Sequence, residues 1–517
     1  MRAAIRAVIT FLCLFAGWKL LARASFEWYG SEHSDVAIFA TVAKGWLNGY
    51  RPYIDLFENK APGIYMMIAA SLRLFGDHRL LWWMQAIVTM LFPLAVAVPA
   101  YALKRNAIAG MAGFLFGALL SLYVSIKGGP VFIESYAAFA GAIFVGLLAT
   151  RRYPLTLRDQ LLCAIPLCAA LAFKEPMFFS IMGGALIVLP SFRSLRSLLL
   201  PIGLVTMVGI AALWIFGFLA GYVSVYLPHI VTHHLFHPWG TVGEPMWLRI
   251  IDLPRMWENL GTVSAALPWV ILMVWVSSGI LLVRPSVFFH SLTPSPSPAS
   301  GRGGLYFPVI GRWLLATLLT ALPVGLTGDF YFHHFVFAVP GYVGFFLVCV
   351  REWNAFPNAL LKKIFFAIFT LFVLFGLFAI STPFGARDDD WRAWAAPRIR
   401  AGAILDAVMD RCAVDRYFAD IDRPEGVYGF TRHSPYGPIF TQYGRFIGVR
   451  QQYLDAFLQT LERAEILLMR TPDEVVQADP ATRAFIADAF TEKPWPCAGN
   501  DFAQPSPYRI LFRAGAR

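Results

Sequence analysis

Long apolar stretches alternate with short polar ones over the first 384 residues of the chain. A helix needs about 20 apolar residues to cross the roughly 30 Å hydrocarbon core of a bilayer, or somewhat fewer when it packs between partners. The pattern predicts eleven membrane-spanning helices, at residues 4–23, 80–103, 107–126, 131–150, 159–173, 176–190, 199–220, 263–283, 306–327, 331–350 and 363–382. The run at 61–76 is ambiguous, because it contains Arg73 and makes a helix of only about 24 Å.

The pattern changes after residue 384. Residues 385–517 have the composition of a soluble domain, and short apolar runs such as AEILLMR and YRILF alternate with helix-like segments such as QYLDAFLQTLERA. We therefore predict a helical membrane domain at 1–384, with its first outer loop at 24–79, followed by a small α/β domain at 385–517. The segment SLTPSPSPASGRGG at 291–304 has the composition of a disordered inner loop.

Composition supports a polytopic membrane protein. The chain is 58% hydrophobic and 15% charged, and its mean hydropathy is +0.59; soluble domains rarely show that balance. Basic residues exceed acidic ones by 11, but residues 385–517 hold 17 basic and 18 acidic residues. The excess therefore lies in the membrane part, where it orients the helices, and we expect no nucleic-acid partner. The first apolar run has no convincing cleavage site and is interpreted as a retained span.

The distribution of basic residues predicts the orientation of the chain. If the N-terminus is cytoplasmic and residues 61–76 do not cross, the short inner loops collect Arg2, Arg6, Lys104, Arg105, Arg151, Arg152, Arg158, Arg193, Arg196, Arg284, Arg302, Arg312, Arg351, Lys362 and Lys363. A crossing at 61–76 would place nearly all of them on the other side, against the positive-inside rule. We therefore predict interfacial helices in the first outer loop. The protein would then lie in the inner membrane of a bacterium, with its C-terminal domain in the periplasm.

Cysteine usage leaves one question open. Four of the six cysteines lie in predicted spans, where they are small core residues. Cys412 and Cys497 both lie in the C-terminal domain. In an oxidising periplasm they either form a disulfide or stay free, and the sequence does not decide between the two.

With this topology, the ionisable groups without an anchoring role gather on the outer side. Loops that return to one face can converge on one cavity, and ionisable groups at membrane depth are candidates for function. These groups are Glu32, His33, Asp35, Asp55, Glu58, Lys60, Lys127, Glu134, Lys174, Glu175, His229, His233, His234, His237, Asp329, His333 and His334.

Structural explanations compete for several of them. Lys174 can cap a tight turn, Lys127 can snorkel to the interface, and Glu134 can complement a helix N-terminus. The four histidines at 229–237 fit interfacial residues better than a zinc site. His333 and His334 are either interface anchors or phosphate contacts, and Asp35 is also explained by helix capping alone.

A chemical interpretation of Asp35 comes from a second acidic cluster about 20 residues later, on the same predicted face. Two carboxylates at a membrane-facing cavity suit glycosyl transfer from a phosphate-linked lipid. One carboxylate accepts the proton of the acceptor hydroxyl as that hydroxyl attacks the anomeric carbon. Cations such as Lys60 and Lys174 would offset the charge of the departing phosphate.

The segment SDVAIFATVAKGWLNGYRPYIDLFENKAPGIYMMIAASLRLFG, residues 34–76, resembles the first outer loop of bacterial GT-C class membrane glycosyltransferases. These include glycosyltransferase family 39 and the RgtA/B/C/D-like group, and they are related to the protein O-mannosyltransferases and the lipid A aminoarabinose transferase. The family pattern Gly-x-x-Pro-Tyr-x-Asp matches residues 49–55, with Lys60 and Pro62-Gly63 following. Weaker similarities surround Glu134, Lys174 and FYFHHFVFAVPG.

The chain also departs from the family pattern. Val36 replaces the usual second acid after Asp35, Ala61 replaces a proline after Lys60, and His334 replaces an aromatic residue. These changes argue against a two-acid role at 35–36 but leave Asp35 as a single base.

The resemblance implies an inverting transferase that uses a polyprenyl-phosphate sugar, without a nucleotide donor, on the outer face. Asp35 would be the general base. Asp55, Glu58 and Lys60 would shape the sugar and phosphate site, and Lys174, His333 and His334 would bind the lipid phosphate, with Glu134 and Lys127 as additional residues. The acceptor would be lipid A or lipopolysaccharide, a polysaccharide, a glycolipid or a protein. No cofactor is implied, and a divalent cation stays open.

Two other functions compete with this interpretation. A polysaccharide polymerase or ligase would also use lipid-linked sugars in the periplasm. A secondary transporter would also combine many spans with charges, but its polar residues should lie near the bilayer midplane, in paired repeats. No repeat of fixed period is visible here, and the charges gather at one predicted edge.

Overall fold

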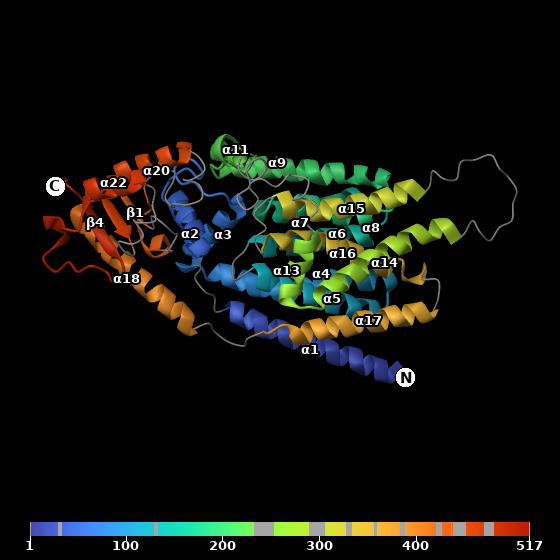
Figure 1. Cartoon of the computed structure of the whole chain (residues 1–517). Coiled ribbons are helices and arrows are strands. Elements are labelled where there is room, and N and C mark those ends of the chain that lie inside the picture. The colour runs from blue at the N-terminus through green and yellow to red at the C-terminus, as the bar shows by residue number, and fades with distance from the viewer. Residues whose placement is uncertain are drawn as a thin grey trace. The chain divides into compact units, whose positions relative to one another are not determined.

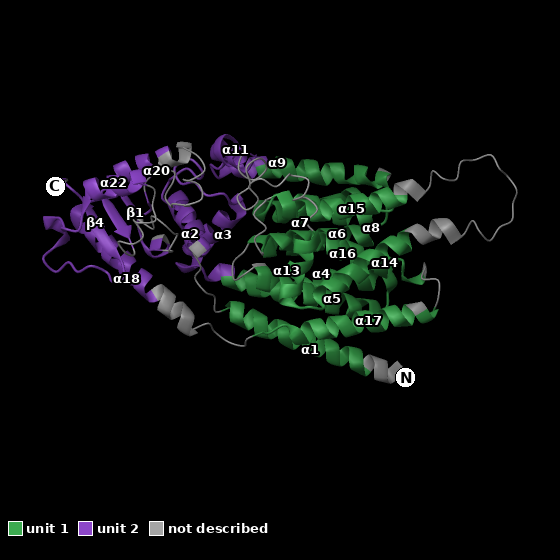
Figure 2. Ribbon diagram, in the orientation of Figure 1, with its two compact units in different colours: residues 1–29, 82–209, 234–385 green, residues 30–81, 210–233, 386–517 purple. Residues whose placement is uncertain are grey.

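The computed structural model describes residues 2–28, 34–128, 133–231, 253–288, 306–326, 333–355, 359–382, 388–419, 427–435, 437, 451–469 and 480–515. Helices make up most of these residues, and four short strands lie in the C-terminal region (Figure 1). The chain forms two compact units (Figure 2). Unit 1 comprises residues 1–29, 82–209 and 234–385, and unit 2 comprises residues 30–81, 210–233 and 386–517.

Unit 1 consists of helices. Its main elements are α1 (Arg2–Trp28), α4 (Arg79–Lys104, whose first residues belong to unit 2), α5 (Ala107–Gly128), α6 (Ile133–Thr150), α7 (Leu157–Phe173), α8 (Met177–Val188), η1 (Phe192–Leu198), α9 (Leu199–Ile215, which ends in unit 2), α13 (Leu253–Val263), α14 (Leu267–Phe288), α15 (Tyr306–Leu326), η5 (His334–Ala338), α16 (Val339–Arg351), η6 (Trp353–Ala355) and α17 (Ala359–Ala379).

Eight helices among the described residues have the length and apolar composition to cross a membrane. Each of the eleven predicted spans coincides with a helix, but α7, α8 and α14 do not meet both criteria. The structure therefore confirms a helical, multi-pass membrane protein and leaves the number eleven unconfirmed.

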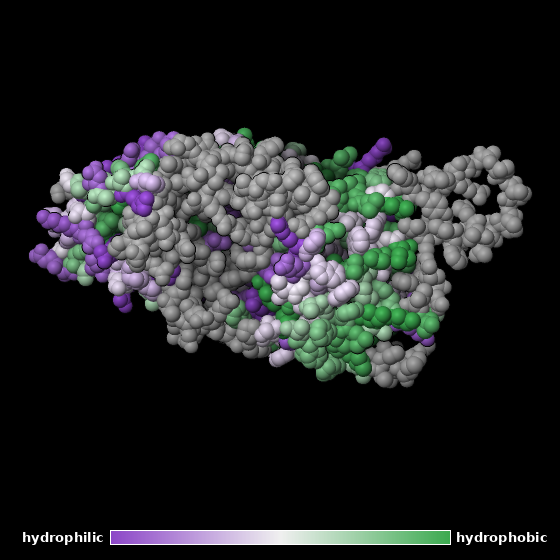
Figure 3. Space-filling model, viewed as in Figure 1, coloured by the Kyte–Doolittle hydropathy of each residue, from purple (hydrophilic) through white to green (hydrophobic). Residues whose placement is uncertain are grey.

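The surface of unit 1 carries the apolar side chains that a bilayer requires. Met207 on α9 is 71% exposed and Leu371 on α17 is 64% exposed. Figure 3 shows hydrophobic side chains along the visible helices of unit 1 and hydrophilic ones over the C-terminal part of the chain. Such large apolar surfaces are unusual for a protein in water, and they match faces that contact lipid.

The core of unit 1 lies around α6, α8 and α16. Helices α8 and α16 cross closely at Gly184 and Gly344, where a Cβ added to Gly344 would lie 2.8 Å from the Cα of Gly184. Small residues at helix crossings let backbones approach, which is the usual way that membrane helices gain packing contacts.

Two of the predicted inner-loop cations also have structural partners. The Arg312 guanidinium donates to the carbonyls of Leu189 and Pro190, both at 3.0 Å, and Arg351 donates to the carbonyl of Val188 at 2.5 Å. These carbonyls lie at the C-terminal end of α8, where helical acceptors lack intrahelical partners. These two arginines therefore donate hydrogen bonds to carbonyls at the end of a helix, in addition to their predicted part in orienting the chain.

Unit 2 combines short helices with a small sheet. Its helices are α2 (Ser34–Leu47), α3 (Pro62–Phe75), α10 (Leu219–Gly221), the π-helical η2 (Tyr222–Tyr226), α11 (Leu227–His229), α18 (Asp388–Cys412), η7 (Val427–Phe430), α20 (Gln451–Arg463), α22 (Pro480–Ala489) and η8 (Pro496–Ala498).

The ambiguous run at 61–76 is helix α3, with 14 residues. Pro62 begins it, at a position where the missing backbone N–H is no loss. Gly76 ends it with a φ of 74°, and its N–H donates to the Leu72 carbonyl at 2.9 Å. A helix of this length is about 21 Å long, which is short for a span, and its interfacial location stays a prediction.

The sheet has the order β1-β2-β4-β3. Its strands are β1 (Tyr417–Ala419), β2 (Ile466–Met469), β3 (Phe490–Thr491) and β4 (Arg509–Arg513). β1 and β2 are parallel, whereas β4 is antiparallel to both β2 and β3. β2 and β4 lie in the predicted runs AEILLMR and YRILF, so the α/β prediction for the tail is confirmed.

A disulfide joins Cys412, at the end of α18, to Cys497 in η8, with a Cα–Cα distance of 5.2 Å. The pairing that the sequence left open is therefore present. The domain boundary at 384/385 stays a prediction, since residues 30–81 and 210–233 group with residues 386–517 in unit 2. The predicted inner loop at 291–304 lies outside the described residues.

Candidate functional site

The predicted site residues fall into one group in each unit. Unit 2 contains Asp35, Asp55, Glu58 and Lys60, and unit 1 contains Lys127, Glu134, Lys174, His333 and His334. The convergence of the two groups on one cavity stays a prediction. Glu32, His33, His233, His234, His237 and Asp329 lie outside the described residues.

Asp55 organises the turn that opens the charged loop of unit 2. Its Oδ2 accepts from the backbone N of Arg51 at 2.7 Å, and its Oδ1 accepts from the Arg51 guanidinium at 2.7 Å. Hydrogen bonds from the Arg51 side chain hold the pKa of Asp55 below its usual value. The stabilisation is therefore complete above about pH 4 and is lost as pH falls through the lowered folded pKa. It is small, because both side chains are partly exposed.

Tyr53 anchors the same loop from inside. Its φ is 66°, in the left-handed region that a bulky residue rarely adopts. The ring is buried against Tyr65 and Tyr226, with centroids 6.0 and 5.0 Å away. The hydroxyl donates to the Lys60 carbonyl at 2.7 Å. The tyrosine of the Gly-x-x-Pro-Tyr-x-Asp pattern thus holds both ends of the loop, and its buried contacts stabilise an otherwise unfavourable backbone conformation.

The loop presents Lys60 to the helix that carries Asp35. The Lys60 ammonium lies 3.6 Å from the carboxylate of Glu58, a residue that is buried. It also lies 5.8 Å from the centroid of the Phe39 ring on α2. Phe39 follows Asp35 by four residues, and residues four apart share one helical face. Asp35, in the first turn of α2, therefore shares the helical face of Phe39, the ring beside the Lys60 ammonium.

In unit 1, Lys174 and Glu134 form an ion pair. Lys174 caps the C-terminal end of α7, and Glu134 lies in the first turn of α6. Their charged atoms are 3.1 Å apart, and the Glu134 side chain is only 1% exposed. The Lys174 ammonium also lies 5.4 Å from the centroid of the Phe337 ring. Lys174 thus occupies a helix end, as its structural alternative held, and the same residue supplies a cation inside a largely buried pair.

The two histidines join this group through Phe337. The His334 ring stacks on Phe337 at 5.4 Å, and the His333 ring lies 4.4 Å from His334. The Lys174 cation and the His334 imidazole thus lie against one aromatic ring, and the His333 imidazole lies beside His334. Together they are a set of groups able to contact phosphate oxygens. Lys127 lies at the C-terminal end of α5 and is half-buried.

His229 is the described member of the histidine-rich segment. Its ring is buried and packs edge-on against Phe57, with centroids 4.7 Å apart, in unit 2. In the described part of the chain, no three metal-ligating side chains form a cluster. His229 therefore has a packing role next to the charged loop.

Sequence reasoning missed a buried polar cluster in unit 1. Arg23 and Glu27 on α1 form an ion pair at 3.3 Å, with side chains 9% and 0% exposed. Glu27 accepts from Thr89 at 2.6 Å and Gln85 at 3.5 Å on α4, and it also bonds Ser125 on α5. Arg23 donates to the Ser125 carbonyl at 3.0 Å. The signal was the i,i+4 spacing of Arg23 and Glu27 in ARASFEW, a segment that continues past the predicted end of the first span at residue 23.

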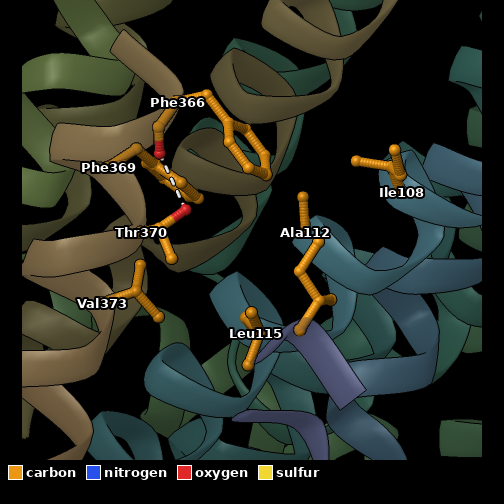
Figure 4. A pocket seen from close by; sticks show the side chains of 8 residues that line it. Ile108, Ala112, Leu115, Phe366, Phe369, Thr370 and Val373 are labelled. Carbon is orange, nitrogen blue, oxygen red and sulfur yellow. Dashed lines mark hydrogen bonds between the residues drawn. The ribbon is translucent and has the colours of Figure 1, made fainter. Parts of the chain in front are cut away.

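Figure 4 shows a pocket of a different kind in unit 1, between α1, α5 and α17. Its polar atom is the hydroxyl of Thr370, which donates to the Phe366 carbonyl of its own helix at 2.7 Å. Because no ionisable side chain lines it, this pocket suits hydrocarbon. The lining residues are Ile9, Ile108, Ala112, Leu115, Phe366, Phe369, Thr370 and Val373.

Two structures of ArnT from Cupriavidus metallidurans are among the solved structures that this chain resembles. The structure bound to undecaprenyl phosphate is 12% identical, with a TM-score of 0.48, and the apo structure is 12% identical, with a TM-score of 0.41. Each match covers 99% of this chain and 98% of the other. ArnT is the GT-C lipid A aminoarabinose transferase, a relative already named by the resemblance of the first outer loop. No family model and no curated protein matches the sequence. We assign no residue role from this likeness.

Proposed function

We propose that this protein is a membrane glycosyltransferase that moves a sugar from a polyprenyl-phosphate donor to an acceptor on the periplasmic face. The observation that carries the proposal is the arrangement in unit 2. Asp35 shares a helical face with Phe39, and the Lys60 ammonium, which pairs with Glu58, lies beside the Phe39 ring. The loop that builds this arrangement is also the segment that resembles the GT-C transferases.

The proposed reaction is a single displacement. The acceptor hydroxyl oxygen forms a bond to the anomeric carbon, and the bond from that carbon to the phosphate oxygen breaks. Asp35 takes the hydroxyl proton as general base, and the polyprenyl phosphate leaves with the bonding electron pair. A displacement of this kind inverts the anomeric centre.

The departing phosphate monoester gains negative charge, which nearby cations stabilise. Lys60 is one proposed phosphate-binding residue. Lys174, His333 and His334 are further proposed phosphate-binding residues, and Glu134 pairs with the Lys174 ammonium. The proposed chemistry uses no cofactor, and a divalent cation stays open.

We also propose that the N-terminus lies in the cytoplasm and the C-terminal domain in the periplasm, an orientation that the basic residues of the short loops favour. The buried cluster of Arg23 and Glu27 agrees with polar groups gathering near one end of the helices. Glu27 lies one residue before the end of α1, and Ser125 lies three residues before the end of α5. A secondary transporter would favour polar sites near the midplane.

Cells that lack the gene should lose one glycosylated envelope product and accumulate a polyprenyl-phosphate sugar, because the donor is no longer consumed. Mass spectrometry of the glycolipid, polysaccharide and lipid-carrier pools, before and after complementation with the wild-type gene, measures both changes. A polymerase or ligase would instead leave oligosaccharide repeats on the carrier. Unchanged pools, or accumulation of a soluble substrate alone, would contradict the proposal.

A further inference from the structure

Helix α2 contacts the C-terminal region through the face opposite Asp35. Ala37 and Lys44 on α2, and Asn48 directly after its last residue, recur at spacings of seven and four residues. Because the Asn48 N–H still donates to the Lys44 carbonyl at 2.9 Å, the three share one face. At about 100° per residue, that face points roughly 180° away from Asp35 and Phe39. One side of α2 therefore meets the charged loop, and the other meets residues 427–434, all within unit 2.

Three contacts join α2 to this segment. The Lys44 ammonium donates to the Thr431 carbonyl, and the Asn48 amide donates to the Ser434 hydroxyl at 3.4 Å. Gly429 lies directly against Ala37, since a Cβ added to Gly429 would lie 3.1 Å from the Ala37 Cβ. The contact thus combines a close backbone approach with a charged hydrogen bond.

Residues 427–434 are in turn fixed to the rest of the C-terminal region. The buried Asp406 carboxylate on α18 accepts from the backbone N of Arg432 at 3.0 and 2.9 Å. The buried Tyr417 hydroxyl on β1 lies 2.7 Å from the Thr431 hydroxyl and 3.0 Å from the His433 carbonyl. A continuous set of contacts therefore runs from the sheet and α18, through this segment, to the helix of Asp35.

Apolar packing could hold α2 against this segment without the hydrogen bonds of Lys44 and Asn48. Apolar surfaces are non-directional and tolerate small shifts of a helix along its axis, whereas a charged hydrogen bond fixes both distance and direction. A displacement of about 1 Å in a catalytic group can cost as much as 100-fold in rate. A helix that carries a general base is therefore a place where such a bond affects function.

We propose that residues 427–434 position α2, and through it Asp35, for the transfer reaction, with Lys44 as the positioning residue. This inference rests on the proposed function for the role of Asp35. It gives the C-terminal domain a task in catalysis, although the domain contributes no group to the reacting atoms.

Replacing Lys44→Met keeps the length of the side chain and removes the bond to Thr431. We expect kcat for sugar transfer to fall about tenfold, while the KM for the donor stays within about twofold, because α2 shifts without loss of the donor contacts. Lys44→Arg, which restores a donor, should recover most of the rate. Lys493→Met, at an exposed lysine of the same unit, is the matched control and should leave kcat unchanged. Unchanged kcat in Lys44→Met would overturn the proposal.

A second experiment tests the contact without using activity. The pair Ala37→Cys and Gly429→Cys places two thiols within reach of a disulfide, and peptide mass spectrometry detects the bond, with Cys412–Cys497 as the internal standard. We expect a high yield with Lys44 present, a lower yield with Lys44→Met, and recovery of kcat in the oxidised triple variant. If the yield of the disulfide between positions 37 and 429 is the same with and without Lys44→Met, the inference is overturned. If the wild-type protein shows no sugar transfer, only the proposed function is overturned.

Discussion

Replacing Asp35→Asn should lower kcat for transfer from a polyprenyl-phosphate sugar by about 10²- to 10⁴-fold, the range that general base catalysis contributes. Asparagine has nearly the same shape as aspartate but cannot accept the proton of the attacking hydroxyl. The Glu58–Lys60 pair and its contact with Phe39 are untouched, so donor binding should persist. Initial rates with the purified protein, at varied donor concentration, separate kcat from KM.

Asp77→Asn is the control for this experiment. Asp77 belongs to the same unit, is partly exposed, and pairs with Arg79 at 2.6 Å. Its loss should leave the rate within about twofold of the wild type. Full activity in Asp35→Asn would exclude Asp35 as the base. A rise in donor KM with unchanged kcat would make Asp35 a binding residue instead.

Replacing Arg23→Met should destabilise unit 1 by about 3–5 kcal/mol, because it leaves the Glu27 carboxylate buried without its countercharge. Glu27 is fully buried and bonded to groups on both α4 and α5, so this loss should loosen three helices at once. Thermal unfolding of the full chain in detergent, followed by circular dichroism, measures the change.

The double variant Arg23→Met with Glu27→Gln should recover part of this loss, since the amide keeps a hydrogen-bonding group without a buried charge. The coupling between the two substitutions is then measured by the double-mutant cycle. Arg158→Met, at an exposed arginine, should change little. If Arg23→Met were as stable as this control, the cluster would have no role in holding the helices together.

The fold followed from the sequence where local pattern decides it. Apolar runs predicted the helices of unit 1, and AEILLMR and YRILF predicted strands β2 and β4. The short run at 61–76 did form a separate helix, bounded by Pro62 and Gly76. These features depend on hydrophobicity and on residues with fixed backbone preferences, both visible in one segment at a time.

Partners distant in the sequence were less predictable. Lys174 was recognised as a turn residue, but its partner Glu134 lies on another helix, 40 positions earlier. The cluster of Arg23 and Glu27 includes side chains from α4 and α5. The predicted first span, at residues 4–23, also ended before Glu27. The contact of Lys44 with Thr431 joins segments 387 residues apart. No local pattern carries such pairings, because they arise only when the helices pack.

The central claim is that the sugar comes from a polyprenyl phosphate, and direct transfer by purified protein tests it most closely. Lipid extract from cells lacking the gene supplies both the accumulated donor and the membrane acceptors. Adding the wild-type protein in detergent should consume the lipid-linked sugar and release one polyprenyl phosphate for each sugar transferred, without any nucleotide sugar. A lipid-linked pool that stays unchanged while an added nucleotide sugar is consumed would contradict the account.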